Sequence, residues 1–258
     1  MAKKARVPVV KTERLADGIF GLTVLEQEMA ALTKPGQFLS LYLEDKSRLL
    51  PRPISICGID KEKGTLRMVF RVAGEGTRQL SWLKEGDFLE VLGPLGNGFY
   101  ETKIRSAIVI GGGIGIPPML ALAKHLQEQG IQVTAVLGYR SEPAFLLPEF
   151  EAYAEAVAAT EDGSLGIAGN VLDAIREKKL SADMLFACGP TPMLRGIKAF
   201  SEQSGIPAQL SLEERMACGI GACLACVCKT KEKDAHSEVH NRRICKDGPV
   251  FYAQEIEL

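Results

Sequence analysis

The hydrophobic pattern of this chain of 258 residues changes once, near residue 100, and that change limits the folds open to it. Before it, short runs of alternating or β-branched apolar residues are separated by turn residues, as in antiparallel barrels and sandwiches. After it, continuous apolar runs alternate with helical patterns, which indicates a parallel sheet covered by helices. The sequence therefore predicts a multi-domain α+β protein.

The first part is expected to form an antiparallel β-barrel over residues 1–101. Its strand-like runs are 6–10, 18–25, 37–43, 66–72 and 88–91. Glycine-containing turns such as Lys63-Gly64 and Gly96-Asn97-Gly98 separate them. One short helix is expected over residues 76–83.

The second part, residues 102–210, is expected to be an α/β domain. Buried parallel strands are predicted over 107–110, 131–137 and 182–187, because each is a continuous apolar run. Helices are predicted over 119–129 and 192–203, the first of them closed by Gly130.

The third part, residues 211–258, is short and rich in glycine and cysteine, with a strand-like run at 249–253. Five of the seven cysteines of the chain lie here. So few apolar residues cannot form a large core, so we expect a bound inorganic group to stabilise a small third domain.

The cysteine spacing indicates which group. Cys218, Cys223 and Cys226 follow the pattern C-x4-C-x2-C, and Cys245 is available as a fourth thiolate. This is the ligand order of plant-type [2Fe–2S] centres. Four of the residues between are small, which lets backbone N–H groups approach sulfur: Gly219, Gly221, Ala222 and Ala225. Cys228 is left out of the ligand set because the spacing is complete without it.

Zinc is the alternative metal, since it also accepts four cysteines. Structural zinc sites usually have two close cysteine pairs, and only one such pair is clear here. His236 and His240 are further ligand candidates for zinc, although a polar surface loop explains them as well. Cys57 and Cys188 stand in apolar segments, which favours a structural role for both thiols.

Two glycine-containing turns follow predicted strands. Gly111-Gly112-Gly113-Ile114-Gly115 joins a buried strand to a helix, where a phosphate can approach the backbone. It does not match the dinucleotide fingerprint G-x-G-x-x-G, and tight helix–sheet packing is an alternative reason for its glycines. Cys188-Gly189-Pro190 follows another strand at the same expected sheet edge, where open α/β sheets bind ligands.

Composition argues against a nucleic-acid-binding, membrane-spanning or secreted protein. The formal net charge is −1 and no basic run is longer than a pair, so no nucleic-acid partner is expected. No stretch approaches the roughly 20 apolar residues of a membrane span. Charged residues follow Met1 almost at once, unlike in a signal peptide. A cytoplasmic protein is expected.

Together the motifs Arg52-Pro53-Ile54-Ser55, 111–115 and 188–190 resemble the ordered signature of ferredoxin–NADP reductase-type flavoproteins. The segments 93–99 and 211–216, with the cysteines that follow, are similar to one branch, the electron-transfer subunits of NAD-dependent dihydroorotate dehydrogenase. The resemblance covers nearly the whole chain.

The resemblance implies site residues. For FAD, Arg52 pairs with the pyrophosphate and Ser55 lies near the reactive ring edge. The complete set that it implies for FAD is Arg52, Pro53, Ile54, Ser55, Val69, Phe70, Arg71, Gly76 and Thr77. For the nicotinamide nucleotide the implied set is Gly111, Gly112, Gly113, Gly115, Cys188, Gly189 and Pro190. The implied cluster ligands are Cys218, Cys223, Cys226 and Cys245.

It also implies an activity. A partner subunit that carries FMN oxidises dihydroorotate, and electrons pass through [2Fe–2S] and FAD to NAD in pyrimidine biosynthesis. A heterotetramer with two subunits of each kind is expected. No arginine cluster for a 2′-phosphate is evident, which favours NAD over NADP. The alternatives are a ferredoxin–NAD(P) oxidoreductase subunit of another complex, and a zinc-binding regulator that senses nucleotides.

Overall fold

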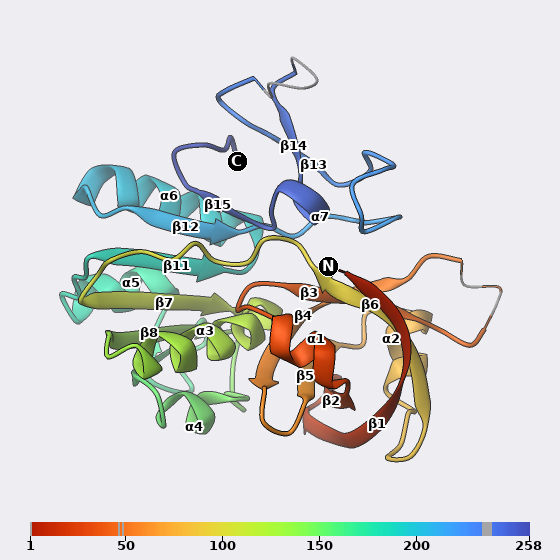
Figure 1. Cartoon of the computed structure of the whole chain (residues 1–258). Coiled ribbons are helices and arrows are strands. Elements are labelled where there is room, and N and C mark those ends of the chain that lie inside the picture. The colour runs from red at the N-terminus through yellow and green to blue at the C-terminus, as the bar shows by residue number, and fades with distance from the viewer. Residues whose placement is uncertain (1, 46, 48, 234–238) are drawn as a thin grey trace.

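A computed structural model describes residues 2–45, 47, 49–233 and 239–258. Three parts are visible in Figure 1: a barrel that contains the N-terminus, a layered α/β part beside it, and a small region, shown in blue, that lies over both. The predicted multi-domain α+β architecture with an N-terminal barrel is confirmed.

The barrel is a closed sheet of six strands in the order β1-β2-β5-β4-β3-β6, with every neighbouring pair antiparallel. The strands are β1 (Lys3–Ala16), β2 (Ile19–Leu25), β3 (Phe38–Tyr42), β4 (Arg52–Asp60), β5 (Thr65–Arg71) and β6 (Phe88–Leu95). Two short helices, α1 (Gln27–Leu32) and α2 (Glu75–Leu80), lie in the connections. Alternating apolar residues fill the interior, and Leu39 and Leu41 are fully buried there.

The outer side of β3 is also buried, although outer barrel positions usually meet solvent. Phe38 is 3% exposed and packs in a core with residues of the C-terminal region, and Ser40 is 1% exposed. The C-terminal region therefore covers this part of the barrel wall.

The α/β part contains a sheet of seven strands in the order β10-β9-β8-β7-β11-β12-β15. Its strands are β7 (Ser106–Gly112), β8 (Gln132–Tyr139), β9 (Glu155–Thr160), β10 (Ile167–Ala168), β11 (Met184–Cys188), β12 (Ala208–Ser211) and β15 (Val250–Tyr252). All neighbouring pairs are parallel except β12 and β15. The predicted parallel sheet is confirmed for β7, β8 and β11.

Helices cover both faces of this sheet. On one face α3 (Ile116–Glu128) and α4 (Leu147–Phe150) pack in one core, and on the other α5 (Val171–Glu177) and α6 (Thr191–Ser204) pack in a second. The helix α3 begins three residues before its predicted start, because Pro117 and Pro118 fit the first turn, where an N–H needs no partner.

The C-terminal region is small, as expected, and it is joined to the α/β part by a shared core and a shared sheet. It contains a two-stranded sheet, β13 (Val227–Lys229) with β14 (Asn241–Arg243), and the short helix α7 (Ile244–Asp247). Its final strand β15 leaves it and pairs with β12 of the large sheet. Cys226, Ile244 and Cys245 are buried in the same core as α5 and α6, so this region shares a core that it is too small to form alone.

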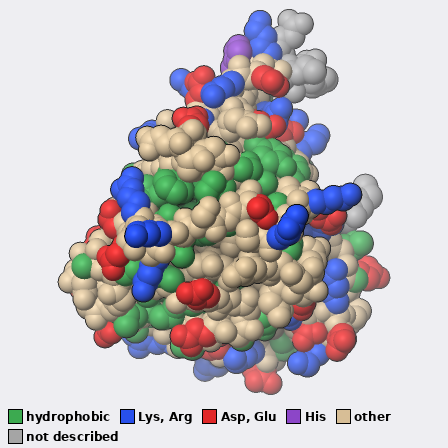
Figure 2. All heavy atoms as spheres, turned by 90° about the vertical axis from the view of Figure 1, so that its left-hand side faces the viewer, with side chains coloured by type: hydrophobic (Ala, Val, Ile, Leu, Met, Phe, Trp, Pro, Cys, Tyr) green, Lys and Arg blue, Asp and Glu red, His purple; other side chains and the backbone are tan. Residues whose placement is uncertain are grey.

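The surface on the left of Figure 1 carries charges of both signs. Figure 2 shows basic and acidic side chains interspersed there. Among the described residues, no helix has the length and hydropathy required to span a membrane.

Candidate functional site

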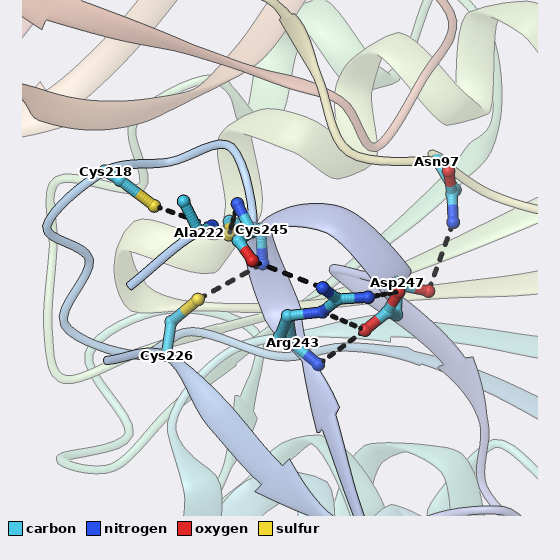
Figure 3. A network of polar contacts seen from close by, with 8 residues as sticks. Asn97, Cys218, Ala222, Cys226, Arg243, Cys245 and Asp247 are labelled. Atoms are coloured by element: carbon cyan, nitrogen blue, oxygen red, sulfur yellow. Dashed lines mark hydrogen bonds and ion pairs between the residues drawn. The ribbon is translucent and has the colours of Figure 1, made fainter. Parts of the chain in front are cut away.

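Three of the predicted cluster cysteines, Cys218, Cys223 and Cys226, lie on a loop rich in backbone donors, and the fourth, Cys245, lies in helix α7. The thiols of Cys218, Cys226 and Cys245 point toward one another in Figure 3. Backbone N–H groups of Ile220 and Ala222 donate to Cys218 Sγ at 3.5 and 3.3 Å. Gly221 donates to Cys245 Sγ at 3.1 Å, and the Cys245 N–H donates to Cys226 Sγ at 3.4 Å. Donors of this kind stabilise thiolates and bound clusters.

These contacts act unequally on the thiols. Burial raises the pKa of Cys218, but N–H groups of Ile220, Cys223 and Ala222 outweigh it and lower the pKa to about 6. Burial and the Cys226 thiol raise the pKa of Cys245 to about 12. Cys218 is therefore ready to bind as a thiolate, whereas Cys245 must release its proton to solvent as it binds a metal.

The loop is held by an arginine that sequence reasoning missed. Arg243 Nε and Nη2 lie 2.9 and 3.1 Å from the two carboxylate oxygens of Asp247. Arg243 Nη1 also donates to the Gly221 carbonyl at 3.2 Å (Figure 3). Asp247 and its neighbour Gly248 are hydrogen-bonded in turn to the segment after β6. The Asn97 side-chain amide donates to the Asp247 carbonyl at 3.1 Å, and the Asn97 backbone N–H donates to the Gly248 carbonyl at 2.7 Å. A chain of contacts thus joins barrel, helix α7 and cysteine loop.

Arg243→Lys is expected to reduce cluster retention roughly tenfold. A lysine cannot make the paired contact with Asp247 that fixes the loop. Loss of a residue that orients metal ligands typically lowers metal affinity by about tenfold or more. Iron and acid-labile sulfide measured after gel filtration test this. Arg242→Lys is the matched control, since the ion pair that the Arg242 side chain makes within the described residues is a long one, of 3.7 Å, with Glu255. Equal iron content in both variants would contradict the role of Arg243.

The other residues considered as metal ligands are not part of the cysteine loop. Cys228 lies on β13, and burial raises the pKa of its thiol to about 11. His240 is exposed, with Nδ1 3.0 Å from the Lys231 carbonyl, and His236 lies outside the described residues. In the part of the chain that is described, no three His, Cys, Asp or Glu side chains are grouped as a site for a single metal ion.

The barrel motif forms a cradle for an anion. Arg52 begins β4, and its guanidinium lies against Gly76 in the first turn of α2, where a Cβ would stand 2.1 Å from Arg52 Nε. Only glycine leaves room for this approach. A guanidinium beside the N–H groups of a first helical turn suits a phosphate or pyrophosphate. The Thr77 hydroxyl stabilises the turn before α2, since it accepts hydrogen bonds from the backbone N–H groups of Ala73 and Gly74 at 2.9 and 3.2 Å.

The remaining barrel residues point in two directions. Ile54 and Phe70 face the barrel core, so they can offer a ligand only their backbone. Pro53 and Ser55 alternate with Ile54 and lie on the outer side of β4. Val69 is 3% exposed and packs against the α/β part, and Arg71 is exposed at the end of β5.

The two loops predicted to bind the nucleotide are brought together at one sheet edge. Cys188 lies opposite Gly111 at the carboxyl ends of β11 and β7. A Cβ on Gly115 would stand 2.4 Å from the Cys188 carbonyl oxygen and 2.6 Å from the Gly189 nitrogen. A Cβ on Gly112 would lie 3.2 Å from Pro190 Cδ. Burial raises the pKa of the Cys188 thiol to about 12, so this thiol is protonated at neutral pH.

Gly115→Ala is expected to lower NADH oxidation with an artificial acceptor by one to two orders of magnitude, roughly the cost of displacing a bound reactant by 1 Å. The added methyl meets backbone atoms, which cannot move aside without separating the two loops. Steady-state rates and FAD content test this. In the control Gly196→Ala the methyl meets only the end of the Leu172 side chain, at 2.9 Å. Equal rates in both variants would contradict the role of the loop contact.

A cavity of about 900 Å³ lies elsewhere, between the barrel and α3, and is lined by none of the predicted cofactor residues. Arg67 bridges Glu13 on β1 and Glu149 on α4 at its wall, at 2.9 and 2.6 Å. Cys57 also lines it, and burial raises the pKa of that thiol to about 12, in agreement with a structural role.

Comparisons with known proteins agree with this geometry. Residues 9–100 match the oxidoreductase FAD-binding domain, 109–199 the oxidoreductase NAD-binding domain, and 213–257 the iron–sulfur cluster binding domain of dihydroorotate dehydrogenase B. Among solved structures, one described as an NADH-dependent reduced ferredoxin–NADP oxidoreductase has a TM-score of 0.88 and 31% identity, covering 98% of this chain and 90% of that one. A ferredoxin reductase of carbazole 1,9a-dioxygenase, with a TM-score of 0.69, 21% identity and coverage of 80% and 67%, shows the shared fold alone.

Curated relatives extend the similarity over the full length. Proteins named dihydroorotate dehydrogenase B (NAD(+)), electron transfer subunit, are 44% identical in Bacillus velezensis, covering 99% of this chain and 100% of the relative. The relative of that name in Listeria monocytogenes is also 44% identical, with 99% of each chain covered. By this full-length similarity, the chain belongs to the family of electron transfer subunits of dihydroorotate dehydrogenase B (NAD(+)).

Proposed function

We propose that this chain transfers electrons to NAD⁺ from a partner subunit that oxidises dihydroorotate. In this proposal FAD binds in the barrel and a [2Fe–2S] cluster binds in the C-terminal region. One observation carries the proposal: the cysteine loop packs on the barrel wall beside the strand that begins with Arg52. Phe38 of β3 shares a core with Cys226 and Cys245, and β3 pairs directly with β4. The two proposed cofactor sites would thus adjoin on one wall of the barrel.

The chemistry requires both sites. Dihydroorotate and NAD⁺ give orotate, NADH and a proton, so two electrons leave one substrate and enter the other. An iron–sulfur cluster moves single electrons, a nicotinamide accepts a pair, and a flavin can exchange either. In the proposal, Arg52 and α2 hold the FAD pyrophosphate, the loops at Gly115 and Cys188 orient the nicotinamide, and Cys218, Cys223, Cys226 and Cys245 hold the cluster.

The proposed partner is an FMN-containing catalytic subunit in a complex with two of each chain, located in the cytoplasm. Exposed apolar side chains around the cysteines support a docking surface here. Ile220 is 54% exposed and Leu224 is 62% exposed, and Val227 lies beside them in sequence. A partner that covered these side chains would bring its own cofactor close to the cluster. The proposed domain boundaries are 1–101, 102–210 and 211–258.

Copurification with the catalytic subunit tests the proposal. We expect the complex to reduce NAD⁺ when dihydroorotate is added. We also expect the purified complex to contain acid-labile sulfide, with about one FAD and two irons for each copy of this chain. Colourless protein after anaerobic reconstitution, or zinc alone with no flavin released on denaturation, would contradict it.

A second candidate is a ferredoxin–NAD(P) oxidoreductase subunit, favoured by the solved structure of 31% identity. Reduction of ferredoxin by the complex, without turnover of dihydroorotate, would support this candidate instead.

A further inference from the structure

One buried hydroxyl has no role in the sites described so far. Ser40 is 1% exposed on β3, and its Oγ has no hydrogen-bond partner among the described residues. Burying a hydroxyl without a partner costs about 1–3 kcal/mol, so such groups in native proteins call for an explanation. The hydroxyl has a donor to offer, and no atom of the described chain accepts it.

The cysteine loop lies against this hydroxyl. A Cβ on Gly219 would stand 2.9 Å from Ser40 Oγ, closer than a side chain permits, and 3.5 Å from Leu95 Cδ1. Gly219 has a φ of +69° and directly follows Cys218. Glycine at this position therefore lets the loop that carries Cys218 press directly against Ser40.

The proposed flavin motif lies on the strand that pairs with that of Ser40. In the pairing of β3 with β4, Ser40 is opposite Pro53, and Phe38 is opposite Ser55. Leu39 and Leu41 point into the barrel, so Phe38 and Ser40 share the outer face. Ser40 is thus next to both the strand of the flavin motif and the cysteine loop.

We propose that the Ser40 hydroxyl donates a hydrogen bond to sulfur of the bound iron–sulfur cluster, on its Cys218 side, and thereby raises the cluster's reduction potential. The inference rests on the proposed function, because it requires the cluster at these cysteines. A donor to sulfur favours the reduced form, which carries more negative charge. By this contact Ser40 tunes electron flow between the two proposed redox centres.

Ser40→Ala in the copurified complex tests this. We expect the equilibrium constant for cluster reduction to fall about tenfold, which is about 59 mV for a one-electron couple. A redox titration followed by electron paramagnetic resonance measures it. Iron content, FAD content and the flavin potential should stay at wild-type values, and Ser40→Thr, which keeps the hydroxyl, should restore the cluster potential.

Thr33→Val is the matched control, because Thr33 is also a buried hydroxyl of the barrel but donates to the Met29 carbonyl at 2.7 Å. An unchanged cluster potential in Ser40→Ala would overturn the inference, and so would a shift confined to the flavin. Failure of the proposed function is separate and visible in the wild type, which would then lack the cluster or flavin signal.

Discussion

Cys223→Ser is expected to yield a yellow protein without an iron–sulfur cluster that still oxidises NADH with an artificial acceptor. A serine hydroxyl does not replace a thiolate at iron, and the remaining three cysteines leave the proposed site incomplete. The barrel cradle at Arg52 and the nucleotide loops share no residue with the cysteine loop. We therefore expect iron near zero, FAD unchanged, and acceptor rates within a factor of about two, the effect of a ~0.5 kcal/mol change. Dihydroorotate-dependent reduction of NAD⁺ should be lost.

Cys228→Ser is the matched control for this variant. Cys228 is only two residues after Cys226, but it lies on β13 and is partly buried against the core. The control should keep its cluster and its activity with the partner. Loss of FAD in Cys223→Ser would contradict the independence of the two sites, and would mean that the core shared by Phe38, Cys226 and Cys245 needs the cluster to form.

Much of the fold could be predicted because its patterns are local. Continuous apolar runs indicated β7, β8 and β11, and alternating runs indicated most barrel strands. The strand β9 was missed because its segment Glu155–Thr160 is rich in alanine, a residue depleted in strands, and only burial between β8 and β10 makes it a strand. The return of β15 to the large sheet was missed because strand pairing over a long separation has no sequence signal of its own.

In the candidate site, too, residues in local motifs could be predicted, and residues that act through long-range contacts could not. Motifs in which the functional residues are consecutive or closely spaced, such as 111–115 or Cys218 to Cys226, could be found in the sequence. Asn97, Arg243 and Ser40 could not, because their roles depend on contacts across the folded chain. Asn97 meets Asp247 at a separation of 150 residues, and Ser40 meets the loop of Gly219 only because the C-terminal region covers β3. The glycines 96 and 98 around Asn97 were the one available signal.

Loss of FAD is the expected result of Arg52→Ala, and it follows from how closely Arg52 and helix α2 are packed. The guanidinium lies against Gly76, so its charge and the N–H groups of the first helical turn face one ligand position. A charge-assisted hydrogen bond contributes about 1.5–3 kcal/mol, so the affinity for FAD should fall roughly ten- to a hundredfold. Because every electron is proposed to pass through FAD, both NADH oxidation and turnover of dihydroorotate should fall with flavin content.

Dialysis followed by flavin fluorescence of the denatured protein measures this, and added FAD should restore activity in part. Arg78→Ala is the matched control, since Arg78 lies on the same helix but pairs with Glu75 at 3.2 Å at an exposed position. Arg52→Lys should lie between the two, because an ammonium keeps the charge but not the planar pair of donors. If Arg52→Ala retained its flavin as well as Arg78→Ala does, the cradle formed by Arg52 and Gly76 would bind no pyrophosphate, and the flavin would have to be held elsewhere on the barrel.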